Sequence, residues 1–248
     1  MKRNTNRMLT MHAGSLARPP DLREMVLDKS NGQPYDEEAL ARRLRSAVAE
    51  VVQQQIAVGL DSINDGEFSK TNFTNYARER LSGHAERSGA PGNPLARIYG
   101  RDAQEFPEYF AGRGNLGGTE VICTGPLTFI GQAALQADID NFKAALQGVE
   151  GPEPFLPAVA PGTIEHWMKN EYYRSDEEFL NAIADAMHEE YKAITDAGFL
   201  LQIDDPDLAD AWQIQGDMTV PEYRKFAALR IEALNYALRD IPEESVRF

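Results

Sequence analysis

Acidic side chains follow two short apolar runs of this chain, and a glycine precedes each run. The run after Gly59 ends at Asp65 and Glu67, and the run after Gly198 ends at Asp204. Packing does not explain a carboxylate at the carboxyl end of a buried strand. If the two strands are parallel neighbours, both acid clusters lie at one edge of the sheet, which in an α/β barrel carries the active site. The feature therefore suggests an enzyme and indicates where its site lies.

The elements that must position these acids alternate between strand and helix. Strands are expected at 8–12, 60–64, 120–124, 155–159 and 199–203, and Val246–Phe248 begins a sixth. Helices are expected at 36–58, 131–147, 175–197 and 219–239. This alternation with right-handed crossovers predicts a parallel sheet. A closed barrel needs about eight strands, so the sheet is either open or belongs to an incomplete barrel.

Capping signals support the helix boundaries. Asp36 fits an N-cap, and Gly59 fits the position just after the same helix. Ser175 and Thr219 each have a glutamate three residues later, the pattern of a capping box.

The segment 82–118 lacks such periodicity, because glycine and proline interrupt it repeatedly. We interpret it as an insertion after the second βα unit. Long loops of this kind are either lids and binding segments or disordered surface insertions, and both interpretations stay open.

Composition narrows the class of protein. The chain has 248 residues with 25 basic and 39 acidic side chains, a net charge of −14, which argues against nucleic acid and anionic membranes as partners. Its one cysteine, Cys123, excludes an internal disulfide framework and is expected in the core. His84, His166 and His188 have no metal-ligand spacing and are expected at the surface. No signal peptide or membrane span is evident, so we expect a cytoplasmic protein.

Four segments together resemble a known family. They are His-Ala-Gly-Ser-Leu-Ala-Arg-Pro at 12–19, Gly-Leu-Asp-Ser-Ile-Asn-Asp-Gly-Glu at 59–67, Thr-Gly-Pro-Leu-Thr at 124–128 and Leu-Gln-Ile-Asp-Asp-Pro-Asp-Leu at 201–208. In this order and spacing the chain resembles the catalytic barrel of the cobalamin-independent methionine synthase family, in its short stand-alone form. The wider superfamily includes uroporphyrinogen decarboxylase.

The resemblance implies a fold and a reaction. The fold is a (β/α)8 TIM barrel, truncated here after about five to six βα units, with residues 1–248 as one partial catalytic domain and the insertion at 82–118. The reaction is that of an S-methyltransferase of methionine biosynthesis. Its zinc-bound homocysteine thiolate takes the methyl group of methyltetrahydrofolate and gives methionine. The expected partners are therefore a small amino-acid thiol and a methyl donor.

Substrate-binding residues are implied by the same resemblance. The turn Ala13, Gly14 and Ser15 matches the one that holds the amino-acid carboxylate, although Ser15 also fits an N-cap. Glu67 and Asp204 match the acids that bind the ammonium group, and paired carboxylates suit an ammonium.

Further residues are expected to line the site. Asp210 matches an acid that contacts the pterin, one methylene shorter than the usual glutamate. His12 is either a site residue or a structural histidine. Asp65 and Asp205 precede Gly and Pro, so turn chemistry alone also favours them. Gln132 stands where the long enzymes carry a pterin-stacking tryptophan, which questions folate as the donor.

The metal is the larger departure from the family. Its zinc ligands, His-x-Cys followed by a Glu and a Cys, are expected after Arg247-Phe248, and Cys123 does not match a ligand. We therefore assign no metal ligand and no catalytic residue, and expect this chain alone to be inactive.

Two other functions fit the same fold. One is a zinc-dependent epoxyalkane:thiol transferase of the coenzyme M type, which Gln132 slightly favours. The other is a non-catalytic binding fragment or split subunit whose partner supplies the remaining strands. The sequence does not indicate an oligomeric state.

Overall fold

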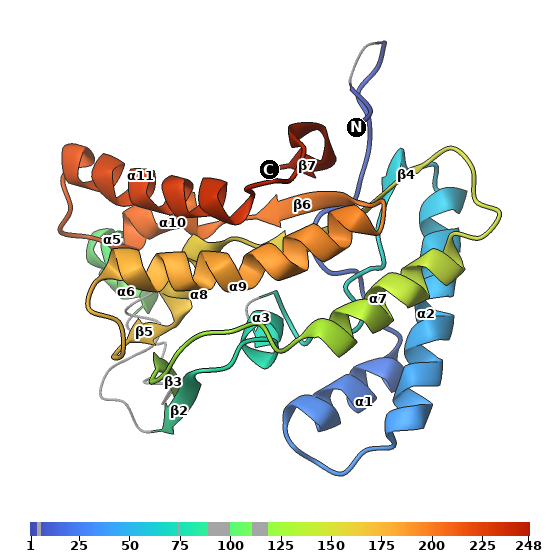
Figure 1. Ribbon diagram of the computed structural model, residues 1–248, viewed down its shortest axis with the longest axis horizontal. Helices are drawn as coiled ribbons and strands as arrows, with labels where there is room; N and C mark the ends of the chain where they lie inside the picture. Colours follow the sequence, from blue (N-terminus) through green and yellow to red (C-terminus); the bar gives the residue numbers. More distant parts are fainter. Residues whose placement is uncertain (4–5, 74, 89–99, 111–118) are drawn as a thin grey trace.

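A parallel four-stranded sheet forms the centre of the protein. The computed structural model describes residues 1–3, 6–73, 75–88, 100–110 and 119–248. In the sheet the strand order is β1 (Ser62–Ile63), β4 (Glu153–Val159), β6 (Leu200–Asp204) and β7 (Val246–Arg247) (Figure 1). The expected strands at 60–64, 155–159, 199–203 and the C-terminal segment are confirmed, although β1 and β7 are short.

The expected third strand lies in a different sheet. β3 (Thr119–Cys123) pairs antiparallel with β2 (His84–Ser88) and parallel with β5 (Lys169–Asn170). The central sheet has no place for it, because β1 pairs directly with β4 from Ser62 to Glu153. The prediction that 120–124 continues the central sheet is therefore wrong, and the reason is strand pairing that no local signal encodes.

The expected first strand is reduced to a single parallel bridge between Met11 and Ser62. The carboxylate of Asp61 explains the loss. Its Oδ2 accepts the backbone N–H of Thr10 at 2.8 Å, and the side chain also binds the Arg7 guanidinium. A side chain thus takes the place of a ladder carbonyl at this edge.

Helices cover the sheet and connect its strands. The expected ones are confirmed as α2 (Glu37–Ala57), α7 (Gln132–Ala145), α9 (Asp176–Asp196) and α11 (Val220–Ala237). Shorter helices were not predicted: α1 (Pro20–Ser30), α3 (Asn75–Glu79), α8 (Pro161–Trp167) and α10 (Asp207–Ile214). Pro20 and Pro161 start two of them, because proline at the first helical position is favourable although it resembles a break in the sequence.

Helix ends follow their capping signals. The Asp36 side chain accepts the N–H of Ala39, and Gly59 has the positive φ of 80° that suits the residue after a helix. Thr219 and Glu222 form a complete capping box. Ser175 accepts the N–H of Glu178, while the Glu178 carboxylate accepts from Arg174 instead of completing a box.

The segment 82–118, which the sequence predicts to be an insertion, has secondary structure in its described part. It contains β2, α5 (Gly100–Glu105) and α6 (Pro107–Phe110). The segments 89–99 and 111–118 lie outside the described residues, so the prediction of a binding loop or a disordered insertion is not tested there.

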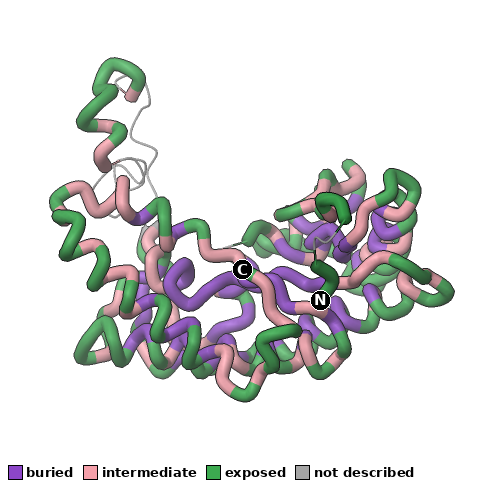
Figure 2. Tube along the Cα trace, turned by 90° about the horizontal axis from the view of Figure 1, so that it is seen from above, coloured by how far each residue is buried: buried purple, intermediate pink, exposed green. Residues whose placement is uncertain are grey.

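The core lies between the central sheet and its helices, where the chain trace is buried (Figure 2). Cys123, in β3 of the second sheet, is fully buried, as expected. His84, His166 and His188 are only partly exposed, and His188 Nδ1 lies 2.9 Å from the carbonyl of Ala237, so their placement at the surface is corrected. Among the described residues, no helix has the length and apolar character needed to span a membrane.

Candidate functional site

The loop after Met11 and the loop after β1 are joined. The Leu16 N–H donates to the Gly66 carbonyl at 3.1 Å. The Arg18 guanidinium donates to the Glu67 carbonyl at 2.7 Å and to the Phe68 carbonyl at 3.0 Å. The turn Ala13, Gly14 and Ser15 therefore lies against the loop that carries Glu67, two features the sequence places about 50 residues apart. Gly14 has φ 77°, which a left-handed turn requires.

Glu67 is buried in an unusual conformation. Its φ is +56°, directly after Gly66 with +73°, and the residue is 1% exposed. Its N–H donates to Asp65 Oδ1 at 2.9 Å, while its Oε1 has no hydrogen-bond partner among the described residues. Left-handed backbone costs about 1–2 kcal/mol for a residue with a Cβ, and buried polar atoms are rarely unpaired. Such strain and an unpaired acceptor are typical of ligand-binding sites.

Other buried polar atoms nearby share this lack of partners among the described residues. They are Nε2 of His12, Nδ2 of Asn64 and Oγ of Ser69. All three residues lie on the two joined loops, within four residues of Leu16 or three residues of Glu67 in the sequence. This set suits a small ligand that itself carries both donors and acceptors.

Asp65, which accepts the Glu67 N–H, is buried. Burial raises the pKa of Asp65 to about 6, the nearby carboxylates of Asp138 and Glu67 act in the same direction, and the Lys70 ammonium opposes them. Lys70 is itself buried, donates to the Pro157 carbonyl at 2.5 Å and lies 4.2 Å from the centre of the Tyr76 ring. The Arg18 guanidinium interacts electrostatically with both Asp65 and Glu67, so Lys70 and Arg18 are the two cations beside these acids.

Substituting Asp65→Asn should stabilise the folded protein near neutral pH. The folded-state pKa of about 6 exceeds the usual 3.8, so the unfolded state releases this proton first. The stability that the raised pKa of Asp65 contributes is fully present below about pH 4, falls between about pH 4 and 6, and is lost above about pH 6. The difference corresponds to about 3 kcal/mol. Urea unfolding from pH 4 to 8 should show the decline in the wild type and a flatter profile in Asp65→Asn. Identical profiles would contradict the assignment.

Asp204 ends β6 at the same edge of the sheet as the Glu67 loop. Gln202 Nε2 donates to Asp204 Oδ1 at 2.8 Å, and Arg247 Nε donates to Gln202 Oε1 at 3.1 Å. β4 separates β1 from β6, and two strand spacings amount to about 10 Å. Both acids therefore stand at the carboxyl ends of parallel strands, as the sequence predicts.

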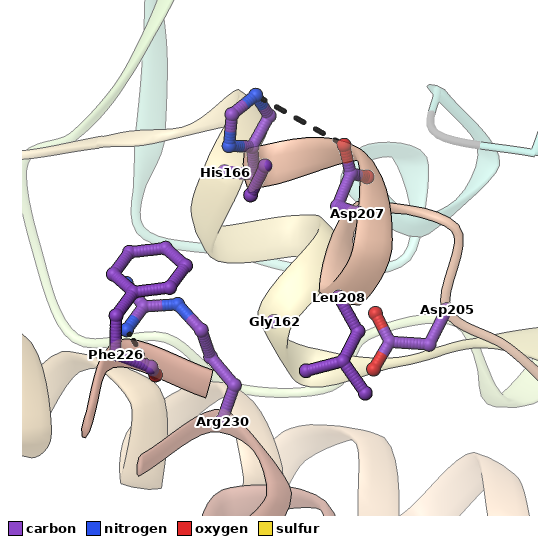
Figure 3. A pocket seen from close by; sticks show the side chains of 8 residues that line it. Gly162, His166, Asp205, Asp207, Leu208, Phe226 and Arg230 are labelled. Carbon is purple, nitrogen blue, oxygen red and sulfur yellow. Dashed lines mark hydrogen bonds and ion pairs between the residues drawn. The ribbon is translucent and has the colours of Figure 1, made fainter. Parts of the chain in front are cut away.

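The other acids after β6 line a hollow beside this edge (Figure 3). Asp205 accepts from the Thr163 hydroxyl at 3.0 Å, and Asp207 accepts from Trp167 Nε1 at 3.2 Å. Burial raises the pKa of both carboxyls. His166 Nε2 lies 4.0 Å from Asp207 Oδ1. Sequence reasoning missed Asp207 and His166, since only the contact between α8 and α10 brings them together.

Within the described part of the chain, Asp210 and Gln132 make no hydrogen bond with the two loops that carry Ser15 and Glu67. Asp210 is an exposed residue in the first turn of α10. Gln132, the first residue of α7, donates to the Phe129 carbonyl at 3.0 Å and to Glu189 Oε2 on α9 at 3.1 Å. The structure thus joins Gln132 to a neighbouring helix, and it brings together the Ala13–Ser15 turn, Asp65 and Glu67.

A buried ionic cluster lies beside two tyrosines that bind the backbone at the end of β4. Arg80 Nη1 lies 2.8 Å from Glu190 Oε1, and Nη2 binds the Asp138 carboxylate. The hydroxyls of Tyr76 and Tyr191 bind the N–H and carbonyl of Val159, at 2.9 and 2.6 Å. Val159 is the register partner of Asp204. The sequence signal was present, because Asp138 and Glu190 interrupt apolar helix faces, as buried paired charges do.

The chain has an α/β fold with a parallel sheet, and acidic residues follow the carboxyl ends of its strands. These features are typical of α/β enzymes. Two solved structures share this fold. One is a B12-independent methionine synthase from a Shewanella species in complex with selenomethionine, with TM-score 0.61, 19% identity, and coverage of 92% of this chain and 57% of that one. The other, from Listeria monocytogenes, is described as a vitamin-B12-independent methionine synthase and has TM-score 0.65, 21% identity, and coverage of 96% and 64%.

Two relatives are similar to this chain in sequence. A methionine synthase of Saccharolobus solfataricus is 28% identical over 196 residues, which are 79% of this chain and 52% of that protein. A 5-methyltetrahydropteroyltriglutamate–homocysteine methyltransferase of Thermotoga petrophila is 28% identical over 96% of this chain and 29% of its own length. No protein-family profile matches. These findings confirm the resemblance to the cobalamin-independent methionine synthases. The chain spans 52% of the length of the Saccharolobus relative and 29% of the length of the Thermotoga relative.

The described side chains do not provide the set of ligands that a zinc ion requires. Among the described residues no three His, Cys, Asp or Glu side chains form a group that could hold a metal ion. The segments outside them contain none of these four residue types. The only cysteine, Cys123, is buried in β3, with its Sγ 3.4 Å from the Gly125 carbonyl. We therefore derive no step through zinc for this chain.

Proposed function

We propose that this chain is the amino-acid-binding part of a methionine synthase-type S-methyltransferase and takes homocysteine or methionine as ligand. The unpaired Oε1 of buried Glu67 carries the proposal, because it suits the ammonium group of an amino acid. The Ala13–Ser15 turn, which the Leu16 N–H joins to the same loop through the Gly66 carbonyl, would hold the carboxylate. Asp204, two strands away, would complete the ammonium site.

The complete fold and the methyl donor are also proposed from the relatives. We infer that the central sheet belongs to a (β/α)8 barrel, supported by its parallel order and by the two structural relatives. The name of the Thermotoga relative supports a methyltetrahydropteroyl donor. Asp210 would contact that donor, as the family resemblance implies.

The proposed ligand contacts indicate how these residues would act on the ligand. Two carboxylates orient the ammonium group through charge-assisted hydrogen bonds, and the backbone of the Ala13–Ser15 turn orients the carboxylate. Together they fix the α-carbon, so that the side-chain sulfur has one direction, toward the methyl donor. Such positioning is the contribution that a preformed site makes to group transfer.

A binding experiment on the purified chain tests the proposal. We expect L-methionine to bind and its deamino analogue, which lacks the ammonium group, to bind at least about tenfold more weakly. Because the zinc donor set does not fit, we expect neither stoichiometric zinc in the protein nor methylation of homocysteine by this chain alone. Calorimetry, metal analysis and a methylation assay give the three results. Equal binding of both ligands would overturn the amino-acid site, and tight stoichiometric zinc would overturn the expected inactivity.

A further inference from the structure

The insertion docks on the C-terminal end of α10 through Arg101. Arg101 Nε donates to the Trp212 carbonyl at 2.9 Å, and Nη2 donates to the Met218 carbonyl at 2.6 Å and the Gln215 carbonyl at 3.5 Å. The last carbonyls of a helix lack partners within it, and a cation there also interacts favourably with the helix dipole. One guanidinium therefore satisfies the end of α10 and the turn after it.

Close packing makes this contact specific. A Cβ on Gly100 would lie 2.7 Å from the Ile214 carbonyl oxygen, so only glycine allows the approach of α5. The Arg101 guanidinium lies 3.9 Å from the centre of the Trp212 ring, a stacking geometry that lysine reproduces poorly.

α10 is held at its other end as well. The Tyr223 hydroxyl of α11 donates to the Leu208 carbonyl at 2.7 Å, and Trp212 packs edge-on against Tyr223. α10 starts three residues after Asp204 and carries Asp207 and Asp210 in its first turn. The position of Asp210 therefore depends on contacts from both α11 and the insertion.

We propose that Arg101 is a positioning residue for the methyl-donor side of the site. This inference rests on the proposed function, in which Asp210 contacts a reduced pterin with a glutamate tail. Arg101 orients α10 and with it Asp210, so the insertion serves the donor and not the amino acid.

Variants of Arg101 separate these roles. Arg101→Ala removes the hydrogen bonds and the stacking, Arg101→Lys keeps only the charge, and Arg42→Ala on the exposed face of α2 is the matched control. Hydrogen exchange of α10 amides should accelerate about tenfold in Arg101→Ala, with β6 unchanged. Affinity for methyltetrahydropteroylglutamate should fall about tenfold, less in Arg101→Lys, while affinity for L-methionine stays constant.

The results of these measurements decide whether Arg101 positions the methyl-donor side of the site. Unchanged exchange in α10, or an equal loss of methionine and folate binding, would overturn it. If the wild type binds methionine but no folate, the proposed donor is wrong and the donor-side role falls with it. Exchange data would still decide whether Arg101 orders α10. If the wild type binds neither ligand, the proposed function itself fails.

Discussion

The substitution Glu67→Gln should weaken L-methionine binding by about 100-fold. It keeps the shape of the side chain and removes its charge, so the ammonium group loses a buried carboxylate partner. Truncating one member of a buried charge pair costs about 2–5 kcal/mol, and about 2.7 kcal/mol corresponds to 100-fold. Calorimetric titration of the variant and the wild type measures the change.

Controls separate this effect from misfolding. Glu38→Gln, an exposed residue of α2, should bind methionine as the wild type does. The deamino analogue should bind Glu67→Gln and the wild type alike, because it has no ammonium to lose. The thermal midpoint of Glu67→Gln should not fall, since the free protein has no partner for Oε1 among its described residues. A variant with unchanged methionine affinity would contradict the ammonium site.

Replacing Arg80 with methionine should destabilise the protein by about 3–5 kcal/mol. Arg80 is 5% exposed and pairs with Asp138 and Glu190, both also buried. Removing it leaves two buried carboxylates without their cation, and breaking a buried pair on one side has a cost of about this size. The midpoint of urea unfolding should fall, with a nearly unchanged slope.

Two further variants test the cause. Replacing Arg80, Asp138 and Glu190 together by Met, Leu and Leu should recover most of the lost stability, because no buried charge remains unpaired. Arg239→Met, which removes a half-exposed pair with Asp185, should cost no more than about 1 kcal/mol. A loss in Arg80→Met as small as in Arg239→Met would show that the buried cluster does not stabilise the fold.

The sequence alone predicts much of the architecture. Helical spacing and capping residues such as Asp36 and Thr219 locate the long helices, because these signals act within a few residues. Gly59 and Gly198 both adopt the positive φ that ends a helix before a strand. The acids after those strands lie at one sheet edge because parallel strands share direction.

Only the tertiary structure decided the pairing and the contacts across the chain. β3 lies outside the central sheet because it pairs with β2 and β5. The local sequence pattern of a strand does not encode its pairing partners. The docking of Arg101 on α10 joins residues 111 positions apart. The burial of Glu67 without a hydrogen-bond partner for its Oε1 among the described residues was likewise visible only in the folded chain. The sequence predicted candidate residues for binding an amino acid, and long-range packing decided that the Ala13–Ser15 turn and the Glu67 loop lie together.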